Sequence, residues 1–377
     1  MEDLNSILTE RRRQTRRSVY QYLYNSPFPR SKQEIAKELS LSLPTVYQNV
    51  SELTDAGLIE YAGSAQPAGG RPAQQLRIVK RAKYSIGISI TGHLLRFVAV
   101  DLAADEIACK EVRHIYNVEE KEYESFVAGQ LEEFISENAL VRENLLGVGI
   151  TVPGIIPPDS STVFYAPTLS LRNLSLQGIV DAIPYPVRLE NDADSGGFAE
   201  WYRDHEHKNI AFLSLSEGVG GAVLVNGDRY TGNNFRSGEF GHMCLERNGR
   251  QCACGKRGCL EAYCSSSRLS SDLGISPEEF FTSLESGNEE YRTIWEEYKE
   301  YLATGIHNIR MALDCDVVLG GIISEYLGPY LPEIRELLSE SDPFCDECDY
   351  IRLTGNPKGS DILGVALWYI RDFLDRI

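Results

Sequence analysis

The residues of this chain that are best suited to binding a metal ion lie between positions 237 and 265. His242 is followed by three cysteines that fall within eight residues, Cys252, Cys254 and Cys259. Thiolates and an imidazole are the ligands that Zn²⁺ prefers, and a tetrahedral site needs four of them to converge. Reduced core cysteines or a disulfide pair are the alternatives, but so polar a run could not bury all three side chains. The sequence therefore predicts one structural Zn²⁺ bound by these four residues.

Two runs in this segment, GEFGH and CACGKRGCLE, resemble the zinc signature of the ROK family (repressors, open reading frames and sugar kinases), a branch of the actin-like ATPase superfamily. The resemblance implies a sugar pocket in which Glu239, His242 and Glu261 contact sugar hydroxyls, with His242 also ligating zinc. It also implies that Asn191 and Asp192 match the catalytic pair of family kinases, whose aspartate accepts the proton of the reacting hydroxyl. A turn or helix-cap role is the alternative for Asp192.

Two turns that would hold ATP phosphates in the family's kinases depart from the kinase pattern here. The first turn lacks the expected acid and the paired glycines, and contains Ser89, Thr91, Gly92 and His93. The second turn, residues 216–222, keeps several glycines but introduces Glu217. Glycine-rich loops bind phosphate through backbone N–H groups, and a carboxylate there opposes the anion by about 1 to 4 kcal/mol. We therefore predict that the chain is not a kinase.

The elements that precede this region predict a DNA-binding head over residues 1–80. Helical spacing over residues 11–25, 31–39 and 44–57 is followed by two strand-like runs around a tip rich in glycine and proline. Two short helices joined by a tight turn are typical of a helix-turn-helix, and the strands add a wing. A helical interaction module is the alternative.

The second of these two helices is expected to present Thr45, Gln48 and Asn49 on its outward face. Amide side chains can pair with adenine edges in the major groove, while threonine and lysine side chains hold phosphates. An arginine in the wing is suited to the minor groove. The residues predicted to contact DNA are Ser31, Lys32, Thr45, Gln48, Asn49 and Arg71.

After the head, strand-like runs alternate with helical periods, which indicates an α/β fold. The run at 210–230 repeats the strand, turn and strand plan found near 84–106, as expected for the duplicated lobes of an actin-like (ribonuclease H-like) domain. We predict a first lobe over 81–197, completed by a C-terminal helix over 362–377. The second lobe is predicted over 198–361, with its zinc loop at 237–265.

Charge and composition limit the possible partners and surroundings. The formal net charge is −18, yet residues 1–80 hold 11 Lys and Arg against 8 Asp and Glu. A basic head on an acidic body is consistent with DNA binding by the head alone. Nine irregularly spaced cysteines, an N-terminus without an apolar signal core and the lack of a long apolar run lead us to expect a cytoplasmic protein without a membrane partner.

Taken with the family resemblance, these features predict a sequence-specific transcriptional regulator. It would bind double-stranded operator DNA and repress sugar-utilisation genes until a sugar or sugar phosphate enters between the lobes. A homodimer or a dimer of dimers is expected, because such heads read paired half-sites. One rival is an ATP-dependent sugar kinase that carries a DNA-binding head. Another is a regulator that responds to zinc or to a protein partner.

Overall fold

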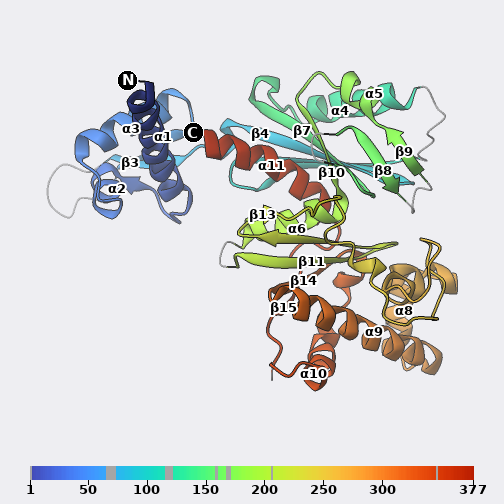
Figure 1. Cartoon of the computed structure of the whole chain (residues 1–377). Coiled ribbons are helices and arrows are strands. Elements are labelled where there is room, and N and C mark those ends of the chain that lie inside the picture. Colours follow the sequence, from blue (N-terminus) through green and yellow to red (C-terminus); the bar gives the residue numbers. More distant parts are fainter. Residues whose placement is uncertain are drawn as a thin grey trace.

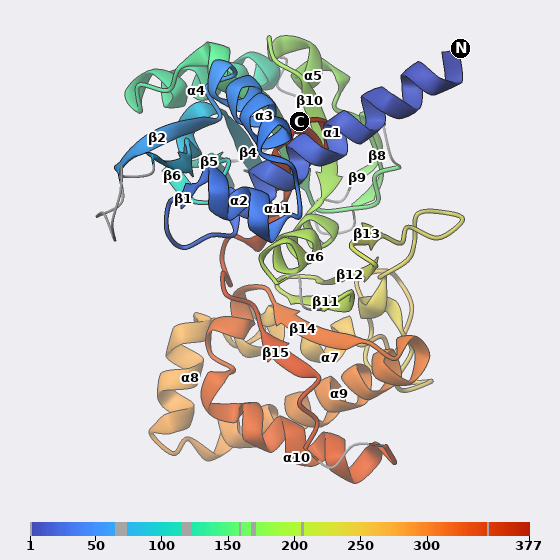
Figure 2. The same cartoon turned by 90° about the vertical axis from the view of Figure 1, so that its left-hand side faces the viewer.

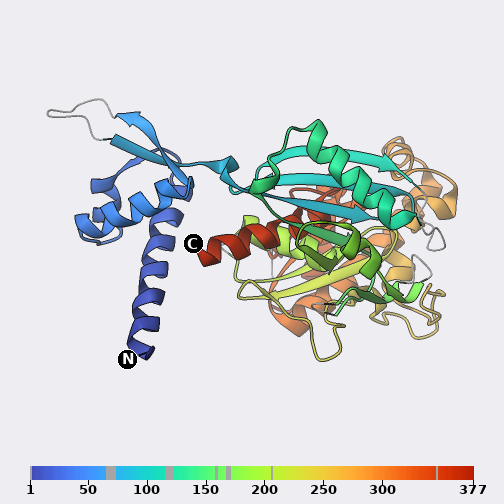
Figure 3. The same ribbon diagram turned by 90° about the horizontal axis from the view of Figure 1, so that it is seen from above.

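A small N-terminal head stands beside two larger α/β lobes, which are stacked one above the other in Figure 1. The carboxyl end of the chain lies next to the head in all three views (Figure 1, Figure 2 and Figure 3). The computed structural model of the protein describes residues 2–64, 74–114, 122–157, 160–166, 171–204, 207–344 and 347–377.

The head has the predicted helix-turn-helix and the two strands of a wing. Its described elements are α1 (Glu2–Tyr24), β1 (Arg30–Ser31), α2 (Lys32–Glu38), α3 (Leu43–Asp55), β2 (Ile59–Ser64) and β3 (Gln74–Ile78). Ser31 begins α2 as predicted, because its hydroxyl accepts from the backbone N–H of Glu34 while the Glu34 carboxylate accepts from the N–H of Ser31. The three strands pair antiparallel in the order β1-β3-β2. The predicted wing tip, including Arg71, lies outside the described residues.

The first lobe is built on a mixed sheet in the order β10-β7-β4-β5-β6. Its elements are β4 (Tyr84–Ile90), β5 (Leu94–Asp101), β6 (Glu106–Arg113), α4 (Tyr123–Glu137), β7 (Leu145–Val152), β8 (Thr162–Ala166), β9 (Leu171–Ser175), α5 (Gln177–Ala182) and β10 (Val187–Asn191). Every residue of β4 is buried, including Ser85 and Ser89, which alternate with large apolar side chains.

The second lobe repeats this topology with a sheet in the order β13-β12-β11-β14-β15. Its elements are β11 (Asn209–Leu215), β12 (Val219–Val225), β13 (Asp228–Arg229), α7 (Glu261–Cys264), α8 (Pro277–Glu285), α9 (Glu289–Leu313), β14 (Asp316–Gly320), α10 (Leu331–Ser341) and β15 (Ile351–Leu353). In each lobe the first strand pairs antiparallel with the second and parallel with the fourth. The predicted duplication of the lobes is therefore confirmed at the level of strand order.

Two helices lie side by side between the sheets, α6 (Asp192–Arg203) and α11 (Ser360–Arg376). The first packs on strands β11 and β12, and the second packs on β4, β5 and β7 of the first lobe. Their backbones approach so closely that a Cβ on Gly364 would lie 1.7 Å from the carbonyl oxygen of Ser195. The last helix therefore packs on the sheet of the first lobe, and a side chain at position 364 would push the two helices apart.

The carboxyl end of α11 joins the lobes to the head. Arg17 of α1 forms an ion pair with Asp375 of α11. One continuous apolar cluster includes Val19 and Tyr20 of the head together with Ile370 and the terminal Ile377. Within the part of the chain that the structure describes, no helix combines the length and apolar character needed to cross a membrane.

Candidate functional site

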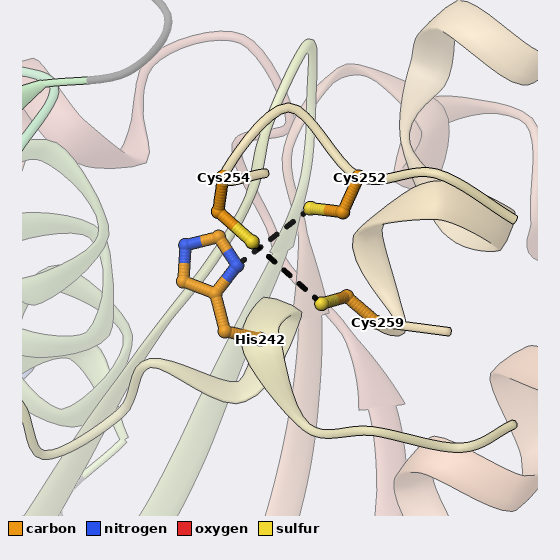
Figure 4. A group of neighbouring side chains, drawn as sticks. All are labelled: His242, Cys252, Cys254 and Cys259. Atoms are coloured by element: carbon orange, nitrogen blue, oxygen red, sulfur yellow. Dashed lines mark hydrogen bonds between the residues drawn. The ribbon is translucent and has the colours of Figure 1, made fainter. Parts of the chain in front are cut away.

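The predicted metal ligands converge in the loop that follows β13. His242 ends a short 3₁₀ turn, and the three cysteines come from the loop after it (Figure 4). The Nδ1 atom of His242 lies 3.9 Å from the Sγ atom of Cys252, and the Sγ atoms of Cys254 and Cys259 are 3.8 Å apart. All four ligand atoms lie within 4.8 Å of one another. Tetrahedral bonds of zinc length place such atoms about 3.6 to 3.8 Å apart, so the donor set fits Zn²⁺.

A glycine allows the metal loop to close. Gly258 has a φ of +75°, and a Cβ there would lie 1.6 Å from the carbonyl oxygen of Glu246. Its own N–H donates to the carbonyl of Arg250 at 2.8 Å, which brings the two sides of the loop together. Only glycine accommodates this backbone without strain. The sequence CGKRGC therefore places the last cysteine opposite His242.

The acids predicted to contact a sugar adjoin the metal ligands. The second ring nitrogen of His242, Nε2, lies 3.8 Å from the Oε2 atom of Glu239. Glu261 accepts a hydrogen bond from the N–H of Val219 at 3.1 Å, and its other oxygen lies 3.3 Å from the sulfur of Cys252. Burial raises the pKa of Glu239, and the nearby carboxylate of Glu261 raises it further. His242 thus turns one nitrogen to the cysteines and the other to the acids.

Asn191 and Asp192 stand where β10 ends and α6 begins. The Asn191 side chain caps the helix by accepting from the N–H of Asp194 at 2.9 Å, and it donates to the carbonyl of Gly154 at 2.9 Å. Asp192 accepts a hydrogen bond from the N–H of Ala193 at 2.9 Å. The helix-cap role that the sequence left open for Asp192 thus belongs to its neighbour, and the Asp192 carboxylate is held at the first turn.

The electrostatics of the Asp192 carboxyl connect three distant segments. Burial raises its pKa to about 6, and the negative charges of Asp361 and Glu239 add to the effect. Asp194 lies behind it and pairs with Arg229 at 3.0 Å. Burial still raises the pKa of Asp194 to about 7. Carboxylates from α6, from the loop after β13 and from the start of α11 therefore act on one another electrostatically.

Side chains hydrogen-bond to one another near the first of the two turns that hold ATP phosphates in the family's kinases, the turn that begins at Ser89. Ser89 of β4 donates to the carboxylate of Asp361 at 2.8 Å, and Arg96 of β5 reaches the same carboxylate at 3.1 Å. The hydroxyl of Thr151 lies 3.5 Å from it. Glu217, in the second turn, is exposed. Sequence reasoning missed Arg96 and Asp361, since 265 positions separate them and neither belongs to a recognisable motif.

The predicted DNA contacts are distributed unequally on the head. Gln48 is exposed, and its amide donates to the carboxylate of Glu52 at 3.1 Å. Asn49 is only 7% exposed and donates to the carbonyl of Thr45 at 2.8 Å. The prediction that Asn49 is exposed on the outward face is therefore wrong. Its position three residues after Val46 places it on the buried face of α3, and its local hydrogen bond compensates for the loss of water.

The remaining predicted contacts in the head occupy the ends of the helices. Ser31 is buried as the cap of α2, and Lys32 follows it with its ammonium 3.1 Å from the hydroxyl of Tyr61. Thr45 shares a 2.7 Å hydrogen bond with the hydroxyl of Ser42 at the start of α3. Contacts of these side chains with DNA remain predictions.

Comparison with known proteins adds family matches over both parts of the chain. The model of the ROK family matches residues 85–371, and a helix-turn-helix domain model matches residues 14–62. The chain is 28% identical to the xylose repressor of Bacillus spizizenii over 363 residues, which covers 94% of each protein. It is 32% identical to the xylose repressor of Bacillus subtilis over 254 residues, 67% of this chain and 65% of that repressor.

A more distant relative and two solved structures extend the comparison. The Escherichia coli DNA-binding transcriptional dual regulator NagC is 25% identical over 247 residues, 64% of this chain and 60% of that protein. A ROK family transcriptional regulator described as a homolog of the E. coli MLC protein superposes with a TM-score of 0.77 at 21% identity over 97% of both chains. A glucokinase from Streptomyces griseus, solved with glucose and AMPPNP, has a TM-score of 0.62 at 19% identity over 76% of this chain and 98% of its own. These structures confirm the predicted fold.

Proposed function

Because the chain belongs to the ROK family and carries a helix-turn-helix head, we propose that it is a sugar-responsive transcriptional repressor of sugar-utilisation genes. The observation that carries this proposal is the presence of both parts in one chain, aligned over 94% of its length with a protein named xylose repressor. The head would bind double-stranded operator DNA, and the lobes would bind the effector.

The proposed effector site lies between the lobes and uses Asp192, Glu239, His242 and Glu261. Hydrogen bonds that sugar hydroxyls donate to the three carboxylates are charge-assisted, and such bonds are stronger than hydrogen bonds between neutral groups. Asn191 would act by positioning, since both ends of its amide are already bonded to the backbone. Both Bacillus relatives are named xylose repressor, so xylose is the first sugar to test.

We propose that the four-residue cluster holds a structural Zn²⁺. A bound Zn²⁺ would supply a charge that stabilises the three thiolates and fixes the loop. In its absence, burial raises the pKa of the Cys259 thiol. Since His242 faces both the cysteines and Glu239, the metal loop would also orient the acids of the effector site.

The repressor relatives support a regulator without enzymatic activity. A sugar kinase remains the alternative, because kinase structures share the fold and Asp192 stands at the cleft. Against it, Ser89 replaces the expected acid, Arg96 and Asp361 pair across the first phosphate turn, and Glu217 would repel phosphate at the second. We therefore propose that the cleft binds sugar without transferring phosphate.

Helix α11 offers a route from the effector to the head. Its first turn carries Asp361, whose charge acts on Asp192, and its last residues pack against α1. A sugar that changes how the lobes close would move this helix and with it the head. A ligand shifts such an equilibrium only by its differential affinity, and couplings of about 1 to 3 kcal/mol are typical. In a dimer or a dimer of dimers, this movement would also change the spacing of the paired heads.

Selection of DNA duplexes from a randomised library by the full chain tests the proposal. Enriched duplexes should bind far more tightly than random ones, and xylose should weaken their binding by about 5- to 150-fold. Glucose, N-acetylglucosamine and their phosphorylated forms serve as comparison sugars. Equal binding to all duplexes, or operator binding that none of these sugars changes, would overturn the proposal.

A further inference from the structure

Two exposed tyrosines and a lysine lie together where the helix-turn-helix meets the wing. Tyr47 projects from α3 with 54% of its surface exposed, and Tyr61 projects from β2 with 45% exposed. The ammonium of Lys32, in the first turn of α2, lies 4.3 Å from the ring centre of Tyr47 and 5.4 Å from that of Tyr61. It also donates to the Tyr61 hydroxyl at 3.1 Å. We call Lys32, Tyr47 and Tyr61 the aromatic cluster.

The aromatic cluster contributes little to the core of the head. Val46, Val50 and Leu53 fill the inward face of α3, and each is at most 1% exposed. Tyr47 lies about a quarter turn around α3 from Val46, and the ammonium of Lys32 lies over its ring. A cation over an exposed tyrosine ring is worth about 0.5 to 1 kcal/mol, enough to favour one orientation of the ring. The cluster therefore presents a pre-organised apolar surface to the outside.

The carboxylates near the aromatic cluster are paired with arginines, so they do not prevent a polyanion from binding there. Glu52 of α3 pairs with Arg16 at 3.1 Å, and Glu60 beside Tyr61 accepts from Arg77 at 2.8 Å. Lys32 has no ion pair with a carboxylate in the described part of the chain. Its ammonium is therefore available to a phosphate, while the neighbouring carboxylates are compensated.

Two polar side chains of α3 already have hydrogen-bond partners within the head, whereas the ring of Tyr47 is exposed. Gln48 is bonded to Glu52, and Asn49 is buried against Thr45. We propose that Tyr47 is a specificity-determining residue of the head, with its ring contacting the C5 methyl group of a thymine while Lys32 contacts a neighbouring phosphate. The thymine methyl is the apolar feature of the major groove, and apolar side chains read it directly. This inference rests on the proposed DNA-binding function.

Deoxyuridine substitution tests the contact, because it removes only the methyl group. Each thymine of a duplex selected by the full chain is replaced in turn, and affinity is measured at fixed salt. At one thymine of each half-site, the wild-type protein should lose about fourfold in affinity, the value of one buried methyl group. Tyr47→Ala should bind the thymine and deoxyuridine duplexes equally, whereas Tyr47→Phe should keep the difference. Phe28→Ala, which truncates another exposed aromatic of the head, should also keep it.

The outcomes separate this inference from the proposed function. If wild-type protein shows no preference for selected over random duplexes, the proposed function fails. If it is specific but no deoxyuridine substitution weakens it, the inference about Tyr47 is wrong. The inference also fails if Tyr47→Ala retains the fourfold difference, or if Tyr47→Phe loses it. Unchanged melting temperatures of the variants would show that the head remains folded.

Discussion

The two ends of the cleft use their charged groups in opposite ways. At the phosphate end, Asp361 accepts hydrogen bonds from Ser89 at 2.8 Å and from Arg96 at 3.1 Å. At the sugar end, Asp192 has no ion pair among the described residues, and burial raises the pKa of Asp192 and of Glu239. A carboxylate without a cationic partner, such as Asp192, is a candidate for ligand contacts, whereas the paired Asp361 supports structure. The comparison supports the proposal that the effector binds at the end that contains Asp192.

The largest expected effect comes from removing a ligand of the proposed Zn²⁺, which lies next to the proposed effector site. Cys254→Ser should lower the zinc content from about one equivalent and destabilise the protein by several kcal/mol, because metal-binding free energy contributes to folding. Metal analysis and thermal unfolding measure the two effects. Cys109→Ser, at an exposed cysteine of β6, should change neither. A Cys254→Ser protein with unchanged zinc and melting temperature would contradict the structural metal site.

Neutralising the sugar end should weaken effector binding without affecting the head. Asp192→Asn replaces an acceptor carboxylate by an amide of the same shape, so sugar affinity should fall by about 10- to 100-fold, the value of a charged hydrogen bond. Calorimetry with the effector gives this affinity, and DNA binding without sugar should stay the same. Asp349→Asn, at an exposed carboxylate, serves as the control. Undiminished sugar binding by Asp192→Asn would place the effector elsewhere.

Breaking the ion pair between Arg96 and Asp361 should lower the stability of the protein without producing enzymatic activity. Arg96→Ala removes the cation of a pair whose side chains are 19% and 20% exposed, leaving Asp361 without its partner. The free energy of unfolding should fall by about 1 to 3 kcal/mol. The exposed pair of Arg77 with Glu60 provides a matched control, and Arg77→Ala should change stability by less than about 1 kcal/mol.

The same proteins test the kinase alternative. Neither the wild type nor Arg96→Ala should phosphorylate a bound sugar with ATP, since the acid expected at position 89 is a serine. Coupled detection of ADP measures turnover. Turnover that disappears in Asp192→Asn would establish a sugar kinase and would remove the distinction between the two ends.

The smallest expected effect is a pH dependence that arises from Asp192. Its folded pKa of about 6 lies above its ordinary value of 3.8. Between these values the folded protein binds more protons than the unfolded chain, so the contribution to stability falls as the pH rises. Asp192→Asn should therefore be more stable than wild type at neutral pH. We expect a difference of about 1 kcal/mol, a part of the about 3 kcal/mol that the full shift represents, because the Asp192 side chain is only partly buried. The difference should vanish in acid. Denaturant titrations across this range measure the difference, and a variant less stable at neutral pH would contradict it.

Several features could be predicted from the sequence because they depend on residues close together in the chain. His242 and its three cysteines belong to one loop, so their types and spacing predict their convergence. The cap at Ser31 and the proline at position 44 predict where α2 and α3 begin. Asn49 shows the limit of arguing from residue type, since helical periodicity alone places it beside Val46 and Leu53. The exposed Tyr47 could have been found by the same count along the helix.

The amino-acid sequence by itself determined the convergence of His242 with its three cysteines, the helix-turn-helix and the repeated lobes, because hydrophobic periodicity and turn residues act locally. Only the tertiary structure decided the pairing of Arg96 with Asp361, the convergence of Asp192 with Glu239, and the contact of Ile377 with the head. The contacts of Asp361 and Ile377 depend on how α11 packs between the sheets, and the close approach at Gly364 constrains that position. Local spacing carries no information about which distant carboxylate reaches which cation, so packing alone decides whether a charged group is satisfied or remains available to a ligand.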